Sequence, residues 1–116
     1  MNTSRSPREL AIDLLPRSIC KVQVAAVLAD NHGIFAWGWN SIGNGSGQHA
    51  ETHAISRASR ERLKGATIYI ASQRRWNKKP ITSKPCPDCW GHIESAWLKK
   101  MVWREAGGIV WQEYWL

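Results

Sequence analysis

The sequence predicts an α/β fold in which a mixed five-stranded sheet lies between helices, as a three-layer α/β/α domain. The chain has 116 residues, a length that fits a single domain with its own core. Helical and strand-like patterns alternate along it, which is typical of a sheet with helices on both faces. The last two strands are joined by a short Ala-Gly-Gly turn. Because so short a connection cannot cross the sheet, we expect these two strands to be antiparallel.

The first part of the chain predicts one helix and two strands. A capping box from Ser6 to Glu9, with proline at the first helical position, predicts a helix that ends near Pro16. Residues 20–29 are rich in valine and alanine and predict a buried strand, and residues 34–40 predict the strand that returns after a turn. We expect one domain over residues 1–116, of which residues 1–5 are disordered.

The second part alternates helices and strands after a glycine-rich loop at 41–48. A stripe of alanines opposite charged side chains predicts a helix from His49 to about Lys64. Pro87 in a first turn, followed by an apolar stripe, predicts another helix over 86–100. Apolar and β-branched runs predict the three remaining strands, at 66–72, 101–105 and 109–116.

Net charge, apolar runs and cysteine count limit the partners and the cellular compartment that we expect for this protein. The net charge of +7 indicates an anionic partner, such as a nucleotide or a nucleic acid, unless it serves only solubility. No run of about eighteen apolar residues is present, and the first residues are polar, so we expect neither a membrane span nor a secretory signal. Three cysteines, an odd number, argue against a disulfide framework and favour a metal or redox site in a reducing compartment. We therefore expect a cytoplasmic protein.

One histidine and two cysteines stand where the two longer helices are predicted to begin. If the helices lie side by side, His49, Cys86 and Cys89 can share one metal ion, and the helix N-termini favour the thiolate form that zinc needs. Three protein ligands with a fourth position open are typical of catalytic zinc. Glu51, two residues after His49, can then move a proton between the metal-bound water and a substrate. Two alternatives stay open: a Cys86/Cys89 redox pair, or a structural zinc site completed by Cys20, His53 or His92.

The segments His49-Ala50-Glu51 and Pro85-Cys86-Pro87-Asp88-Cys89 together resemble the signature of the zinc-dependent cytidine and deoxycytidylate deaminase superfamily. The resemblance extends from about Val22 to the last residue and implies a cytidine-deaminase-like fold. It also implies a hydrolytic deaminase with Zn²⁺ on His49, Cys86 and Cys89, in which Glu51 protonates the ring nitrogen and then the departing ammonia. Many family members place an asparagine against substrate where this chain has Asn40. We expect substrate contacts at Asn40, Ala50, Trp39 and Pro85.

The antiparallel ending resembles the branch that contains free-nucleoside cytidine deaminases, blasticidin deaminases and several toxin-type deaminases. This branch favours cytosine over adenine as the substrate ring. We therefore expect conversion of cytosine to uracil in a nucleoside or nucleotide, with release of ammonia.

A basic loop before the cysteine pair supports two alternative functions. Cationic side chains around an aromatic ring favour contacts to a nucleotide phosphate or a single-stranded nucleic acid, although such a loop can also be merely solvated. The alternatives are a deaminase of cytosine within single-stranded DNA or RNA, and a non-catalytic zinc-containing module that binds nucleic acid. The residues concerned are Arg74, Arg75, Trp76, Lys78, Lys79 and Lys84.

The last eight residues, IVWQEYWL, carry three large aromatic side chains on a strand expected near the sheet edge. Exposed edges are usually covered, so this segment predicts a homo-oligomer, unless it packs as a tail on its own core.

Overall fold

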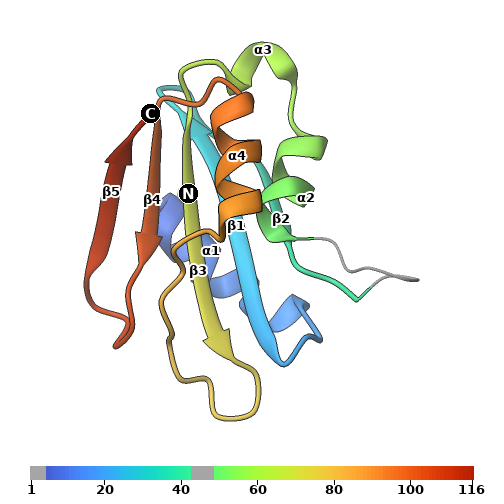
Figure 1. The fold of residues 1–116 in the computed structure, drawn as a ribbon, viewed down its shortest axis with the longest axis vertical. Helices are drawn as coiled ribbons and strands as arrows, with labels where there is room; N and C mark the ends of the chain where they lie inside the picture. Colours follow the sequence, from blue (N-terminus) through green and yellow to red (C-terminus); the bar gives the residue numbers. More distant parts are fainter. Residues whose placement is uncertain (1–4, 43–48) are drawn as a thin grey trace.

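The computed structural model describes residues 5–42 and 49–116 and shows the predicted mixed five-stranded sheet (Figure 1). The strand order is β2-β1-β3-β4-β5. Strand β1 is antiparallel to β2 and β3, β3 and β4 are parallel, and β4 and β5 are antiparallel. The expected antiparallel ending is therefore confirmed. The strands are Val22–Asp30 (β1), Gly33–Trp39 (β2), Thr67–Arg74 (β3), Lys100–Arg104 (β4) and Trp111–Trp115 (β5).

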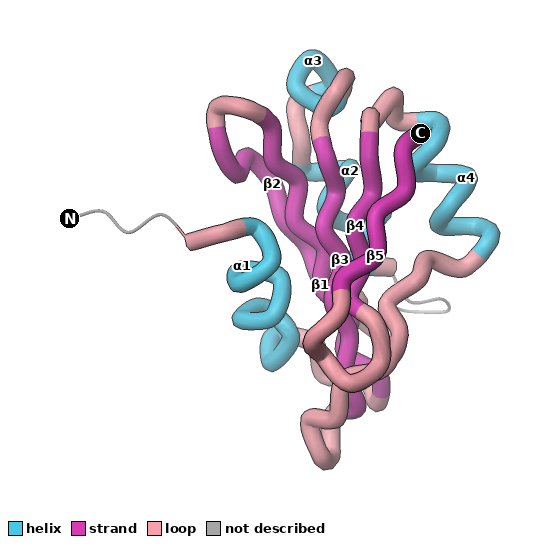
Figure 2. The backbone as a smooth tube through the Cα atoms, turned by 90° about the vertical axis from the view of Figure 1, so that its left-hand side faces the viewer, coloured by secondary structure: helices cyan, strands magenta, loops and turns pink. Residues whose placement is uncertain are grey.

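Helices lie on both faces of this sheet, which confirms the predicted three layers (Figure 2). Helix α1 (Pro7–Leu14) lies on one face, where it contacts mainly β1 and β3. Helices α2 (Ala50–Arg57) and α4 (Pro87–Ser95) lie side by side on the other face. Among the described residues, every helix is too short or too polar to cross a lipid bilayer.

Strand β1 passes through the middle of the core and is buried on both sides. Ala25 and Val27 belong to the apolar cluster beneath α1, whereas Ala26 and Leu28 belong to the larger cluster beneath α2 and α4. Successive side chains of a strand point to opposite faces, so a continuous apolar run is the pattern that such a strand requires.

Helix α1 begins with the capping box that the sequence predicts. The backbone N–H of Glu9 donates to Ser6 Oγ, the backbone N–H of Ser6 donates to Glu9 Oε1, and both distances are 3.1 Å. The helix then tightens into a 3₁₀ turn, η1 (Leu15–Arg17), at the proline expected to end it. The expected disorder of residues 1–5 falls mostly outside the described residues; Arg5, which is described, pairs with Asp13. Residues 43–48 of the predicted glycine-rich loop also lie outside them.

The helix expected to run from 49 to 64 divides into two. Ala58 has extended backbone angles (φ −91°, ψ 152°), and a short helix α3 (Arg60–Leu63) follows in a new direction. The break allows Leu63 to be buried in the core, and it brings the Arg62 guanidinium to Asp30, with N–O distances of 2.8 and 2.9 Å. Packing and this ion pair therefore outweigh the continuous helical pattern.

Helix α4 and strand β5 are both shorter than the sequence predicts. Helix α4 ends at Ser95 instead of residue 100, and Trp97 follows in the left-handed region (φ 65°). Strand β5 begins at Trp111 instead of residue 109, because the backbone N–H of Glu105 donates to the Val110 carbonyl (2.8 Å) and closes a longer loop. Gly107 and Gly108 adopt the positive φ angles that this loop needs.

Candidate active site

The three candidate metal ligands come from the N-termini of α2 and α4. His49 is the residue that caps α2, Cys86 caps α4, and Cys89 lies in the first turn of α4. Neither His49 nor Cys86 uses its side chain to cap its own helix. Because α2 and α4 pack side by side, these N-termini lie close together on the same face of the sheet (Figure 1).

The ligand atoms of His49, Cys86 and Cys89 all lie within 4.8 Å of one another. The distance from Cys89 Sγ to His49 Nδ1 is 3.1 Å. Tetrahedral zinc, with bonds of about 2.0 Å to nitrogen and 2.3 Å to sulfur, needs ligand atoms about 3.5 Å apart. The described part of the chain brings no fourth ligand into this group, and the proposed alternatives Cys20, His53 and His92 lie outside it. The three donors therefore fit a zinc site with one open position.

The Cys89 thiol is held in its protonated form when no cation is present. Burial raises its pKa, and the nearby carboxyl of Glu51 and thiol of Cys86 raise it further. The sequence argument from helix N-termini pointed the other way, and burial outweighs that effect here. A divalent cation between the sulfurs reverses the balance, so metal binding must displace the proton.

Glu51 lies in the first turn of α2 and is only 5% exposed. Burial raises the pKa of its carboxyl, whereas a backbone hydrogen bond and the charge of His49 lower it to a smaller extent. The carboxyl also interacts with the Cys89 side chain. A buried carboxyl with a raised pKa next to a metal site is suited to accept and return a proton.

These groups open into a pocket of about 250 Å³. Asn40, Ala50 and Glu51 line it together with the three metal ligands, so the structure brings the predicted catalytic and metal-binding residues and two predicted substrate contacts to one place. Lys84, one of the predicted phosphate contacts, also lines it. Other lining residues come from β1, β3 and the segment before α4: Val22, Val24, Ser72, Ile81, Thr82 and Ser83.

Two predicted substrate contacts, Trp39 and Pro85, adjoin residues that line this pocket without being among them. Trp39 is not among the described residues that line this pocket; its ring lies 5.3 Å from that of His53 and 5.4 Å from the Arg17 guanidinium carbon. His53 Nδ1 lies 3.2 Å from the backbone nitrogen of Trp39, so this histidine joins α2 to β2. Pro85 is buried beside the metal ligand Cys86, without lining the described pocket.

Asn40 is fixed at the pocket wall by three hydrogen bonds. Its Oδ1 accepts from Ser18 Oγ (2.6 Å) and from the backbone N–H of Val24 (2.8 Å). Its Nδ2 donates to the Val22 carbonyl (2.8 Å). The amide is therefore held in one orientation before any substrate binds.

Serines at the pocket wall were not foreseen from the sequence. Ser72 Oγ lies 2.8 Å from Ser83 Oγ and donates to the carbonyls of Ile81 and Thr82. The backbone N–H of Ser83 donates to the Arg104 carbonyl (2.8 Å). These bonds attach the segment before Cys86 to β3 and β4. No motif marks them, because only the fold brings residues about ten positions apart in the sequence into contact.

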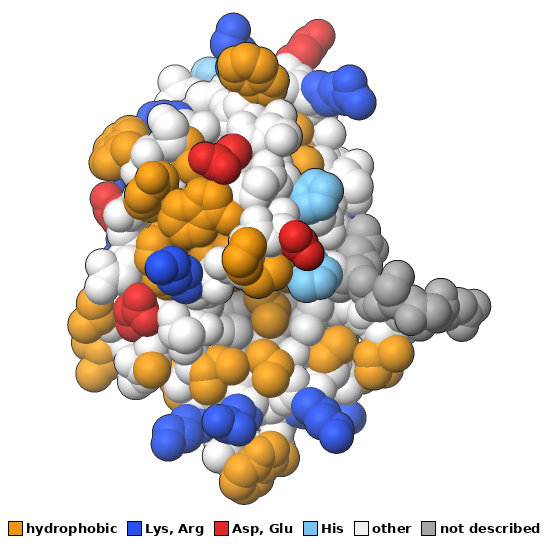
Figure 3. All heavy atoms as spheres, in the orientation of Figure 1, with side chains coloured by type: hydrophobic (Ala, Val, Ile, Leu, Met, Phe, Trp, Pro, Cys, Tyr) orange, Lys and Arg blue, Asp and Glu red, His pale blue; other side chains and the backbone are white. Residues whose placement is uncertain are grey.

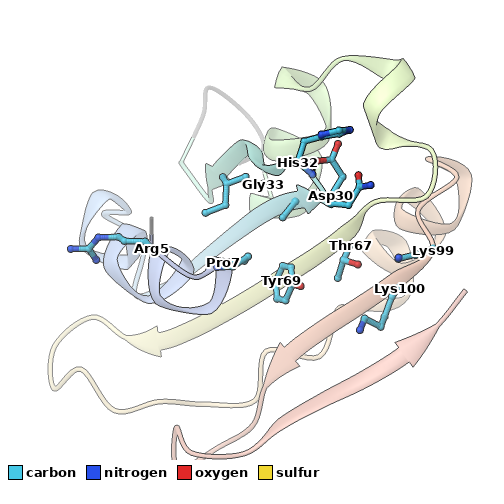
Figure 4. Close-up of a pocket in the computed structure, with 12 residues that line it drawn as sticks. Arg5, Pro7, Asp30, His32, Gly33, Thr67, Tyr69, Lys99 and Lys100 are labelled. Atoms are coloured by element: carbon cyan, nitrogen blue, oxygen red, sulfur yellow. Dashed lines mark hydrogen bonds between the residues drawn. The ribbon is translucent and has the colours of Figure 1, made fainter. Parts of the chain in front are cut away.

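A larger hollow of about 720 Å³ lies between the start of α1, the β1–β2 turn and the first residues of β3 and β4 (Figure 4). Several of its charged side chains are already paired: Asp30 binds Arg62, and the Lys100 ammonium lies 3.6 Å from the Glu113 carboxylate. The described residues that line it include neither a cysteine nor a candidate metal cluster. The smaller pocket, with the metal ligands and Glu51, therefore carries the chemistry.

The model of the cytidine and deoxycytidylate deaminase zinc-binding region matches residues 2–105. The chain belongs to this family. His49, Cys86 and Cys89 lie within the matched region, so family membership and the geometry of the cluster agree on Zn²⁺ as the cofactor. No curated protein matches this family member in sequence.

Solved structures show the same fold. A cytidine deaminase from Burkholderia pseudomallei has 18% sequence identity and a TM-score of 0.73, with 94% of this chain and 89% of that chain covered. The apo dCMP deaminase from cyanophage S-TIM5 has 26% identity and a TM-score of 0.58, covering 88% and 86%. Acinetobacter baumannii RibD, form 2, has 21% identity and a TM-score of 0.55, and the match covers 81% of this chain but 25% of that chain. The cytidine-deaminase-like fold expected from the sequence is confirmed.

Proposed function

We propose that this family member hydrolyses the amino group of cytosine in a nucleoside or nucleotide, giving uracil and ammonia. The observation that carries the proposal is the buried Glu51 carboxyl in one pocket with three metal ligands and an open fourth position. Similarity to a cytidine deaminase and a dCMP deaminase supports cytosine as the ring. Zinc thiolate ligation also suits the reducing compartment expected from the cysteine count.

Zinc held by His49, Cys86 and Cys89 would supply an activated water, because the pKa of water falls from about 15.7 to about 7 on such a metal. Glu51 would take one proton from the water and pass it to the ring nitrogen, while the water oxygen forms a bond to the amine-bearing carbon. The hydroxyl group formed there would give its proton to Glu51, which would pass it to the exocyclic amino group. The bond between the carbon and this amino group then breaks, ammonia leaves, and a carbonyl group remains.

The pocket wall orients the ring for this reaction. Asn40 is held rigidly by its three hydrogen bonds, and the backbone at Ala50 lies in the same pocket as the metal ligands. Lys84 lines the same pocket and offers a positive charge to a phosphate, which supports a nucleotide over a free base. Trp39 and Pro85 contribute indirectly, through α2 and through the position of Cys86.

The test is a screen of the zinc-loaded protein with cytidine, deoxycytidine, their monophosphates, a cytosine-containing single-stranded oligonucleotide and adenosine. Mass spectrometry follows the small mass gain that replacement of an amino group by an oxo group produces. We expect turnover of cytosine compounds. Conversion of adenosine alone would contradict the proposed ring specificity, and conversion of no compound would contradict catalysis.

Glu51→Gln separates catalysis from a role in folding. We expect this variant to keep its zinc but to lose activity by a factor of about 10² to 10⁴, the usual contribution of a general acid–base group. Glu61→Gln, on the exposed surface of α3, is the matched control and should behave as wild type. Unchanged turnover in Glu51→Gln would refute the proton-transfer role. A non-catalytic zinc module predicts that no function of the protein depends on Glu51.

A further inference from the structure

An ordered hairpin projects from the end of β3, between the catalytic glutamate and the cysteine pair in sequence (Figure 1). We call residues 74–80 the Trp76 hairpin. The backbone N–H of Arg74 donates to the Lys79 carbonyl, the N–H of Lys78 donates to the Arg74 carbonyl, and both distances are 2.9 Å. Gln73 and Pro80 form a bridge at its base, and Lys78 adopts a positive φ of 61° at its turn. The segment is therefore a shaped projection and not only a solvated run of lysines.

The hairpin exposes an aromatic ring among cations. Trp76 is 80% exposed, and no aromatic or cation contact is found for its ring within the described residues. This end of the molecule shows a row of Lys and Arg side chains above a hydrophobic group at the tip (Figure 3). None of the ion pairs formed by the described residues involves the cations of this end, which are Lys21, Arg74, Arg75, Lys78 and Lys79.

A hollow beside the hairpin adjoins the active-site pocket. It has a volume of about 670 Å³ and is lined by Lys21, Val22, Arg74, Arg75 and Trp76. Val22 lines the active-site pocket as well. The backbone N–H of Arg75 donates to the Lys21 carbonyl (2.9 Å), and the Arg75 guanidinium donates to the Ile19 carbonyl (3.1 Å). The two hollows thus share one wall, and the hairpin is fixed against the start of β1.

We propose that the Trp76 hairpin binds a nucleotide adjacent to the target cytosine in single-stranded nucleic acid. This inference rests on the proposed deaminase function and specifies its substrate as a polynucleotide. Cations without carboxylate partners complement phosphodiester groups, and an exposed indole ring stacks on a base of any sequence. A free nucleoside has neither a phosphate nor a second base, so it leaves this surface unused. An anionic membrane also attracts lysines and tryptophan, but it does not explain a hollow that shares the lining residue Val22 with the catalytic pocket.

The test measures binding apart from turnover. Fluorescein-labelled oligodeoxycytidylate is titrated with zinc-loaded Glu51→Gln protein in fluorescence anisotropy, with and without Trp76→Ala. We expect Trp76→Ala to raise the Kd roughly 5- to 150-fold, the range for loss of one base–aromatic stack. Trp97→Ala is the matched control, because Trp97 is also 76% exposed but lies beyond the end of α4, and it should leave the Kd unchanged.

Salt dependence tests the phosphate contacts. Replacement of Lys78 and Lys79 by alanine should make the slope of log K against log salt shallower by about 1.4, since each single-strand phosphate contact contributes about 0.7. An unchanged slope would contradict phosphate binding by these lysines.

The outcomes separate this inference from the proposed function. If wild-type protein deaminates cytidine but Trp76→Ala binds the oligonucleotide as tightly as its parent, the hairpin proposal is wrong and the enzyme assignment stands. If Trp76-dependent binding occurs but no cytosine compound is converted, the enzyme assignment is wrong and the binding surface stands. Equal affinity for duplex DNA, or Trp76-dependent binding to phosphatidylserine vesicles but not to the oligonucleotide, would also overturn the hairpin proposal.

Discussion

Gly38→Ala should displace helix α2 and with it the active-site residues at its N-terminus, because β2 and α2 are in close contact at this glycine. A Cβ atom at Gly38 would lie 2.6 Å from the backbone nitrogen of Ala54 and 2.9 Å from Cβ and Cγ of His53. Both distances are below the usual limit for carbon contacts, and the first involves backbone, which cannot rotate away. The added methyl group therefore has to move α2 away from the sheet.

Overpacking of this kind costs about 1–3 kcal/mol of unfolding free energy. At roughly 4 °C per kcal/mol for a domain of this size, the melting temperature should fall by roughly 4–12 °C. Differential scanning fluorimetry measures the shift. Gly91→Ala in α4 is the matched control, because no atom lies within 4 Å of its added methyl group. It should be neutral or stabilise by up to about 1 kcal/mol.

The displacement of α2 should also weaken zinc binding and catalysis, because His49 and Glu51 lie at the start of this helix. Competition with a chromogenic chelator should show weaker zinc binding in Gly38→Ala than in Gly91→Ala. The reasoning is refuted if Gly38→Ala melts at the wild-type temperature and retains the wild-type zinc affinity, since α2 would then not be held against β2 as described.

Two other perturbations follow from the described contacts. Removal of zinc, by a chelator or by Cys89→Ser, should abolish activity and lower the melting temperature, because the three donors lose the cation that they share. Elemental analysis measures the bound metal, and Cys20→Ser is the control that should keep it. Full zinc content in Cys89→Ser would contradict the assignment. Asp30→Asn should reduce stability at pH 7 but not in strong acid, because the Arg62 guanidinium lowers the pKa of Asp30 from 3.8 to about 2. The carboxylate thus stabilises the fold above about pH 4, and this contribution is lost as the pH falls through about 2. Unfolding of both proteins between pH 7 and pH 2 measures the difference in stability, and a difference at pH 2 as large as that at pH 7 would contradict the ion-pair explanation.

The parts of this fold that the sequence predicted well depend on local physical rules. The capping box at Ser6 and Glu9 forms from residues three positions apart, and the apolar run of β1 reports burial on both faces. The metal site was also predictable, because His49 and the Cys86/Cys89 pair each stand at a helix start. Only the side-by-side packing of α2 and α4 had to be assumed.

The features that were missed depend on contacts between distant segments. The helix breaks after Arg57 because burial of Leu63 and the Arg62–Asp30 pair become available there, which no local pattern reports. The raised pKa of the Cys89 thiol depends on burial beside Glu51. The packing of Trp39 against His53 and Arg17 likewise depends on the fold. The prediction of a homo-oligomer stays open: Tyr114 on β5 packs edge-on against Trp90, while Trp115 remains exposed.

The serine contacts beneath the Trp76 hairpin have an evolutionary consequence. Ser72 and Ser83 fasten the strand and the returning segment together between the hairpin tip and Cys86. Insertions, deletions or grafted sequences at the hairpin tip should therefore leave the residues beyond the Ser72–Ser83 contact in place. The positions of the zinc donors relative to one another should not change. The residues of the hairpin tip can therefore change while the reactive centre stays the same, and protein design can use the same point of exchange.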